Sequence, residues 1–264
     1  MEAAQLSAIQ DWFDRFVAGY AGATSADQRN YDLKVTHTRQ VCRHMRRLVA
    51  AEALPADLGC LAEAVAICHD VGRFPQYQRF RTFNDATSMN HGVLAVQTLN
   101  EQGVLRSLPA EERNLLLQAV ALHNVFQLPQ DLAPELDCLV RLIRDADKLD
   151  IWRVLIEYCT ASDDQRASAV TWELPATREC SDAAIAEVAA GRMVHRSLLR
   201  TADDFKLLQL SWVYDLNFCE SFAILAEADY IETLARLLPE QSACEPAVAA
   251  VRAHLEQRRS GDAE

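Results

Sequence analysis

The side chains with the greatest chemical potential in this sequence are histidines and aspartates at otherwise apolar positions. His69 and Asp70 are adjacent at the end of one apolar stretch, and Asp147 lies inside another. A carboxylate among apolar residues is costly to bury unless a cation or hydrogen-bond donors compensate its charge. Three further histidines fall on apolar helical faces or follow a predicted helix start, namely His37, His91 and His123. A divalent metal ion at a point where these side chains converge would satisfy them together.

The donor types narrow the choice of ion. Four imidazoles and two carboxylates without a thiolate suit Fe, Mn, Co, Ni or Zn better than Ca or Mg. A His–Asp pair at a helix end can aim both side chains at one centre, and the two oxygens of Asp70 can bridge two ions. Two ions roughly 3.5–4 Å apart hold a hydroxide in the usual arrangement for attack on phosphorus. Asp145 and Asp150 are lesser ligand candidates, expected to support the site or to pair with nearby basic residues.

The elements that would carry these residues are helices. Apolar residues recur at helical spacing through most of the chain, and no alternation typical of a strand is strong enough to predict one. His37 lies on the apolar face of the second predicted helix. The sequence therefore predicts an all-α fold with metal-site helices over residues 31–155 and a C-terminal helical extension over residues 183–258. We expect residues 1–264 to form a single domain.

Three segments are predicted to be irregular. Pro75 interrupts the helical pattern, so residues 72–88 are expected to form a loop with at most a short helical turn. Ser88 is expected to cap the helix that follows. Residues 161–182 are polar and are expected to form a loop, and the tail over residues 256–264 is expected to fray.

The composition excludes several classes of protein. Of 264 residues, 50% are hydrophobic, whereas glycine and proline number eight each, which favours a sizeable core over disorder. The formal net charge is −12, so general binding to nucleic acid or to an anionic membrane is not expected. No apolar run is long enough for a membrane span, and no signal pattern opens the chain. The eight cysteines form no C-x-x-C pair, so we expect reduced thiols in a cytoplasmic protein.

The order and context of the site residues resemble a known family. His37, the pair His69–Asp70 and Asp147 match the H…HD…D signature of the HD superfamily of metal-dependent phosphohydrolases. The segment HDVGR is similar to the family's H-D-[IV]-G-[KR], and DADKLD resembles the segment that bears its last aspartate. The resemblance covers about half of the chain and implies a helical HD-domain bundle.

The histidines between the HD pair and the last aspartate extend the resemblance to subfamilies of the type H…HD…H…H…D, which bind two metal ions. The resemblance implies two divalent ions, with Fe or Mn favoured and Co, Ni, Zn or Mg as alternatives. The implied ligands are His37, His69, Asp70, His91, His123 and Asp147. A mononuclear site, in which His91 and His123 support the metal or face the substrate, is the alternative.

The same resemblance suggests catalytic and substrate-binding roles. His69 and Asp70 are expected to be catalytic as ligands of the reacting centre. Arg73 is expected to grip phosphate oxygens and to stabilise their charge, the alternative being a surface ion pair. Lys148 and Arg153 are weaker candidates for phosphate binding, because long basic side chains on helices usually reach solvent.

The implied activity is hydrolysis of a phosphomonoester or phosphodiester, with a nucleotide as one candidate, by metal-activated hydroxide. The expected partner is a small-molecule phosphate ester or nucleotide, and apolar C-terminal helices leave an oligomer open. One alternative is a di-iron HD-type oxygenase that uses O₂ with the same six ligands. Another is a non-catalytic module that binds a metal or a nucleotide. The chain lacks a P-loop, a Rossmann glycine pattern, a G-x-S-x-G elbow and the G-Y-P segment of the cyclic-di-GMP-degrading branch.

Overall fold

The fold is all-α, as the sequence predicts. The computed structural model describes residues 1–162, 166–167, 174–175, 177–239 and 241–259, and within these residues no strand is formed. The chain separates into two compact units, one formed chiefly by residues 1–150 and the other by residues 151–161 together with the described residues from 174 onwards. The expectation that residues 1–264 form a single domain stays a prediction.

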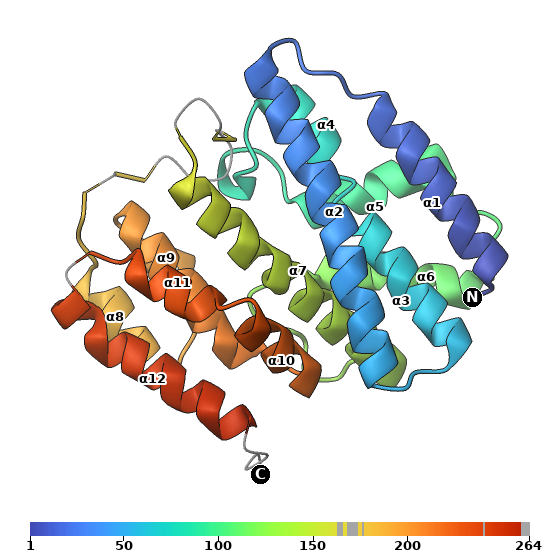
Figure 1. The fold of residues 1–264 in the computed structure, drawn as a ribbon. Coiled ribbons are helices and arrows are strands. Elements are labelled where there is room, and N and C mark those ends of the chain that lie inside the picture. The colour runs from blue at the N-terminus through green and yellow to red at the C-terminus, as the bar shows by residue number, and fades with distance from the viewer. Residues whose placement is uncertain (163–165, 168–173, 176, 240, 260–264) are drawn as a thin grey trace. The chain divides into compact units, whose positions relative to one another are not determined.

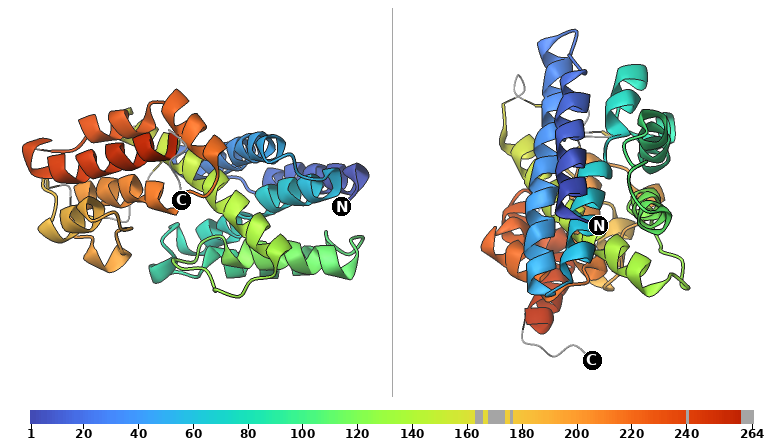
Figure 2. Two further views of the ribbon diagram at one scale, coloured as in Figure 1. Left: turned by 90° about the horizontal axis from the view of Figure 1, so that it is seen from below. Right: turned by 90° about the vertical axis from the view of Figure 1, so that its right-hand side faces the viewer.

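The first unit contains all six predicted metal ligands. Its helices are α1 (Ala3–Ala18), α2 (Ser25–Ala51), α3 (Ala56–Cys68), α4 (Arg73–Phe80), α5 (His91–Gln102), α6 (Ala110–Leu122) and the first part of α7 (Pro134–Thr160), with a short 3₁₀ turn, η1 (Asp85–Thr87). Figures 1 and 2 show α1, α2 and α3 side by side.

Helix α3 is the central element of this unit. Its sequence is apolar on every side, which is typical of a helix surrounded by other elements. It packs against α1, α2 and α6, and from Leu61 to Asp70 every residue except Glu63 is buried. The HD pair therefore stands at the C-terminal end of the most enclosed helix, where its polar groups must find partners inside the protein.

The segment after the HD pair is more regular than expected. The prediction of a loop over residues 72–88 is wrong for its first part, because residues 73–80 form the helix α4. Pro75 is the third residue of this helix, where a backbone N–H has no intrahelical acceptor and its absence costs nothing. The predicted cap at Ser88 is also wrong: Asn90 caps α5, and its side chain accepts a hydrogen bond from the Val93 N–H.

Helix α4 is anchored by an aromatic cluster. The ring of Phe74 is 1% exposed and lies 5.4 to 6.3 Å, centroid to centroid, from four other rings. The four rings belong to Phe13, Phe16, Tyr20 and Tyr31. The cluster ties α4 to α1 and α2, and so fixes the segment that follows the HD pair.

Replacement of Phe74 by alanine should therefore destabilise the first unit. We expect Phe74→Ala to lower the free energy of unfolding by about 3–5 kcal/mol, the usual cost of emptying a buried aromatic position. Phe80→Ala is the matched control, because Phe80 ends the same helix and is 41% exposed. Urea unfolding followed by circular dichroism checks the difference, and equal effects of the two variants would contradict the role given to the cluster.

The second unit is also helical. It contains α8 (Asp182–Ala189), α9 (Ala202–Ser211), α10 (Cys219–Glu227), α11 (Tyr230–Arg236), α12 (Gln241–Arg259) and the 3₁₀ turns η2 (Arg196–Leu198) and η3 (Trp212–Asp215). Helix α12, red in Figure 1, packs against α8, α9, α10 and α11.

Two predicted irregular segments fall in or near this second unit. The expected fraying of residues 256–264 is wrong up to Arg259, where α12 ends, and the remainder lies outside the described residues. Of the expected loop over residues 161–182, residues 163–165, 168–173 and 176 lie outside the described residues, and the described residues of this segment up to Ser181 form no helix or strand.

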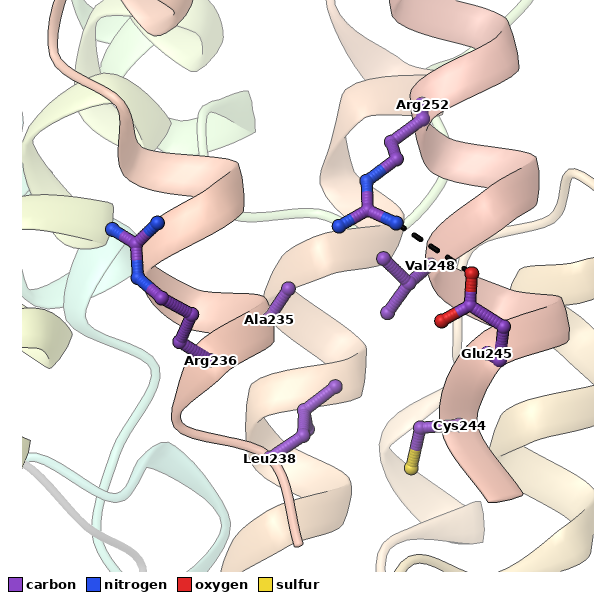
Figure 3. A pocket seen from close by; sticks show the side chains of 7 residues that line it. All are labelled: Ala235, Arg236, Leu238, Cys244, Glu245, Val248 and Arg252. Carbon is purple, nitrogen blue, oxygen red and sulfur yellow. Dashed lines mark ion pairs between the residues drawn. The ribbon is translucent and has the colours of Figure 1, made fainter. Parts of the chain in front are cut away.

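A small cavity lies between α11 and α12, as Figure 3 shows. Its volume is about 140 Å³, and its lining includes Arg236 and Arg252. Arg252 pairs with Glu232 at 2.7 Å and with Glu245 at 3.6 Å, and Arg236 pairs with Asp229 at 2.9 Å. Both guanidinium groups are thus neutralised by carboxylates of the same unit, and none of the predicted site residues lines this cavity.

No described helix combines the length and the apolar character that a bilayer span requires.

Candidate metal centre

Four imidazoles from four different helices meet in the first unit. His37 lies in the middle of α2, His91 is the first residue of α5, and His69 and His123 directly follow α3 and α6. Each is at most 5% exposed. The Nε2 atoms of His37 and His69 are 3.4 Å apart, and those of His91 and His123 are 3.0 Å apart. The imidazoles therefore form two pairs, each with its Nε2 atoms close together.

Asp70 stands between the two pairs. Its Oδ2 atom lies 3.5 Å from Nε2 of His37 and 3.8 Å from Nε2 of His69, whereas its Oδ1 atom lies 3.5 Å from Nε2 of His91. Two sets of candidate ligands result: a first ligand group of His37, His69 and Asp70, and a second ligand group of Asp70, His91 and His123. Within each group the candidate ligand atoms lie within 4.8 Å of one another.

Asp147 joins the first ligand group. Its Oδ1 atom lies 3.0 Å from Nε2 of His37 and 3.7 Å from Nε2 of His69. Its side chain is 17% exposed, against 3% for Asp70. The structure thus brings together all six residues that the sequence predicts as ligands, with Asp147 on the more open side of the group.

The second ring nitrogen of every imidazole is held in place. Nδ1 of His69 lies 2.8 Å from the Ala66 carbonyl oxygen, and Nδ1 of His123 lies 2.7 Å from that of Val120. Both acceptors are carbonyls of a last helical turn, which have no partner within the helix. An Nδ1–H that donates to a fixed acceptor leaves the Nε2 lone pair for a metal ion and sets the orientation of the ring.

Carboxylates orient the other two imidazoles. Nδ1 of His37 lies 2.7 Å from Oδ2 of Asp150, and Nδ1 of His91 lies 2.6 Å from Oδ2 of Asp85. Each ligand group therefore contains one imidazole oriented by a backbone carbonyl and one oriented by a carboxylate. Such carboxylate partners make a metal-binding imidazole a stronger base.

The electrostatic environment favours the metal-binding forms of most of these groups. Burial lowers the pKa of His69 and His91, and burial together with the neighbouring histidines lowers the pKa of His123 to about 3. These imidazoles are therefore neutral near pH 7. Burial raises the pKa of Asp70, but Lys34 and His69 outweigh it and hold that pKa well below the usual range.

His37 behaves differently from the other imidazoles. Burial and Lys34 lower its pKa, but hydrogen bonds to Asp147 and Asp150 outweigh them and raise it to about 9. Burial raises the pKa of Asp147, whereas its hydrogen bond to His37 lowers it, and the net direction is downward. His37 is thus the positive partner of two carboxylates, a role that a bound cation could take over.

The donor set fits two divalent ions. The two oxygens of Asp70 face different ligand groups, so one carboxylate can contribute to both. Imidazole nitrogen and carboxylate oxygen without thiolate suit Fe, Mn, Co, Ni or Zn. The first ligand group with Asp147 offers four protein donors, and the second ligand group offers three.

Arg73 lies beside the second ligand group, but its guanidinium is engaged. Nη1 donates to Oδ1 of Asp85 at 2.9 Å, to Oε1 of Gln76 at 2.9 Å and to the Phe83 carbonyl at 2.6 Å. Nε lies 3.4 Å from Oδ1 of Asp70, beyond ideal hydrogen-bonding geometry. Arg73 thus helps to fix Asp85, the carboxylate that orients His91. Its expected contact with a substrate stays a prediction.

The other two basic residues predicted to bind phosphate are Lys148 and Arg153. Lys148 follows Asp147 in α7 and is buried, with Nζ 3.5 Å from the Arg144 carbonyl oxygen. Arg153 lies beyond the first unit and pairs with Glu157 at 2.6 Å. Substrate binding by Lys148 and phosphate binding by Arg153 stay predictions.

Three residues near the site were not predicted. Lys34 lies one helical turn before His37, a spacing that could have indicated a shared face. Asp85 orients His91 from η1, and the Asn124 amide lies 3.2 Å from Nδ1 of His91. Asp85 and Asn124 carry no sequence signal, because their approach to His91 depends on the path of loops.

The carboxylate behind His37 allows a direct test. We expect Asp150→Ala to weaken metal binding by about 10- to 100-fold, the usual effect of removing the partner of a ligating imidazole. Asp137→Ala is the matched control, because Asp137 is on the same helix and pairs at the surface with Arg141. Competition with a chromogenic chelator measures both affinities. Equal affinities in the two variants would show that Asp150 does not orient a ligand.

Comparison with known proteins agrees with this geometry. The family model described as HD domain matches residues 35–152, a range that contains all six predicted ligands. No curated protein and no solved structure matches the chain. The order of the six residues, their convergence in the first unit and the family match lead to one conclusion. Residues 35–152 match the HD domain.

Proposed function

We propose that this protein is a metal-dependent phosphohydrolase that cleaves a phosphomonoester or phosphodiester. The observation that carries the proposal is the position of Asp70, whose two oxygens face two separate imidazole pairs. A carboxylate in this position can hold two ions close together, the arrangement used for displacement at phosphorus. The HD-domain family contains metal-dependent phosphohydrolases, which agrees with this chemistry.

In the proposed site, each ion has its own protein donors. The first is held by His37, His69, Asp70 and Asp147, and the second by Asp70, His91 and His123. When bound, the ions would lower the pKa of a water molecule to near neutrality and offset the charge of the phosphoryl oxygens. The chain itself holds the imidazoles in one tautomer and keeps the inner faces of the ligand groups dry, since five of the six ligand residues are at most 5% exposed.

The substrate would enter where the site keeps some exposure. The side chains of Lys34 and Arg73 are each 14% exposed, and that of Asp147 is 17% exposed, whereas the imidazoles are nearly inaccessible. Two cations at this opening favour an anionic substrate, although the net charge of the chain is −12. A small phosphate ester or a nucleotide fits this combination better than a nucleic acid, which the acidic surface would repel.

The test is a parallel assay of two reactions. Protein freed of metal and reloaded with Mn²⁺ or Fe²⁺ is incubated with simple phosphate esters and nucleotides, while phosphate release and oxygen uptake are both followed. We expect phosphate release that is lost in His69→Ala, and no substrate-dependent oxygen uptake. Oxygen uptake by the iron form without phosphate release would replace the proposal with a di-iron oxygenase. Metal binding without either reaction would replace it with a binding module.

A further inference from the structure

Lys34 is bound to the oxygen that the first metal ion would need. Its Nζ atom lies 2.8 Å from Oδ2 of Asp70, the oxygen that faces His37 and His69. The two residues come from different helices, since Lys34 is in α2 and Asp70 follows α3. The ammonium group therefore offsets the negative charge of the buried carboxylate.

The ammonium group has more donors than Asp70 uses. A lysine carries three N–H donors. Among the residues that the structure describes, Oδ2 of Asp70 is the one atom that accepts a hydrogen bond from Lys34. Within the described residues the other donors are not used, so they can serve an anion from solution, and the side chain is 14% exposed.

Phe83 positions this cation beside a second one. Nζ of Lys34 lies 5.3 Å from the centre of the Phe83 ring, and the guanidinium carbon of Arg73 lies 5.7 Å from it. An aromatic face attracts cations at such distances. The Phe83 ring thus lies within reach of both positive groups.

A divalent ion and an ammonium group compete for the same oxygen. Both would be drawn to Oδ2 of Asp70, and their like charges repel each other strongly at such a short separation. An ion held by four protein donors would displace the lysine, whose flexible stem starts one turn from His37 and would keep the ammonium group near the first ligand group.

We propose that Lys34 exchanges partners, serving as the counter-ion of Asp70 in the metal-free protein and as a binding group for a phosphate-type oxyanion in the metal-loaded protein. This inference rests on the proposed function for the presence of the metal ions. It predicts that Lys34 opposes metal binding and supports oxyanion binding, so its removal changes the two affinities in opposite directions. A residue needed only for folding would weaken both.

The experiment uses Lys34→Met, with Lys34→Arg as the conservative variant and Arg39→Gln as the control. Arg39 lies on the same helix, and its side chain is 65% exposed in a surface pair with Asp14. The first measurement is the affinity of each metal-free protein for Mn²⁺ alone, by titration calorimetry. The second is the affinity of each Mn²⁺-loaded protein for inorganic phosphate. Thermal melting confirms that the variants are folded.

We expect Lys34→Met to bind Mn²⁺ about tenfold more tightly and phosphate about tenfold more weakly, within the usual range for coupled sites. Lys34→Arg should retain most of the phosphate affinity, and Arg39→Gln should match the wild type in both measurements. Unchanged or weaker Mn²⁺ binding by Lys34→Met would overturn the inference, and so would unchanged phosphate binding. If both affinities change as expected but no ester is hydrolysed, the proposed function fails while the exchange of partners stands.

Discussion

Asp70→Asn is expected to lose both metal ions and all measurable turnover. Asp70 is the one residue that belongs to both ligand groups, with Oδ2 near His37 and His69 and Oδ1 near His91. An asparagine keeps the shape of the side chain but is neutral and has a single oxygen. It therefore cannot bridge two cations or balance their charge. Elemental analysis of protein purified without chelators should give about two ions per wild-type chain and clearly less than one for the variant.

A second variant, His91→Ala, separates loss of both ions from loss of one ion. His91 belongs to the second ligand group alone, so its removal should leave about one ion per chain. Asp14→Asn serves as the surface control, because Asp14 makes an exposed pair with Arg39 and should not affect metal content. Two ions retained in Asp70→Asn would refute the bridging role. One ion in the wild type would favour a mononuclear site in which His91 and His123 are not ligands.

Gly72→Ala should strongly destabilise the first unit. A Cβ atom at Gly72 would lie 2.3 Å from the His91 carbonyl oxygen and 2.5 Å from the Ala95 nitrogen, both backbone atoms of α5. The φ angle of Gly72 is −65°, so the requirement for glycine is one of space rather than of backbone conformation. Because these contacts cannot be relieved by rotation of a side chain, we expect a loss of more than about 3 kcal/mol, at the upper end of overpacking effects.

The effect should extend to the metal centre. The clash would push away the first turn of α5, which carries His91, so the folded fraction of Gly72→Ala should bind the second ion more weakly. Gly59→Ala is the control, because its new methyl group would meet only the end of the Val49 side chain, at 2.9 Å. Urea unfolding with parallel metal analysis separates the two cases. If the two variants prove equally stable, the close approach of α4 and α5 does not limit this position.

The ligands could be predicted from sequence because each has a local signal. His37 and Asp147 are polar residues on apolar helical faces, and the HD pair follows an apolar helix. The sequence pattern therefore predicts that each of these residues is buried. The bridging position of Asp70 follows from adjacency to His69. Whether these groups would meet could not be read from spacing alone, since it depends on how α2, α3 and α7 pack.

The residues that orient the ligands were harder to predict. Asp85 reaches His91 only because Arg73, Gln76 and Phe83 fix the segment between α4 and α5. Pro75 obscured α4 because a proline reads as a helix breaker unless its position in the first turn is known. Asp150, by contrast, lies one turn after Asp147 and was identified as a supporting residue, although its partner His37 could not be inferred.

Two of the four imidazoles are oriented by backbone carbonyls and two by carboxylates, so substitutions can affect the four ligands differently. The orientations of His69 and His123 come from helix-end carbonyls, which no substitution of a side chain removes. Those of His37 and His91 come from Asp150 and Asp85, each of which a single codon change can alter. The preference of each ligand group for a metal ion can thus be engineered separately, through one carboxylate for each group, while the backbone carbonyls behind His69 and His123 stay unchanged.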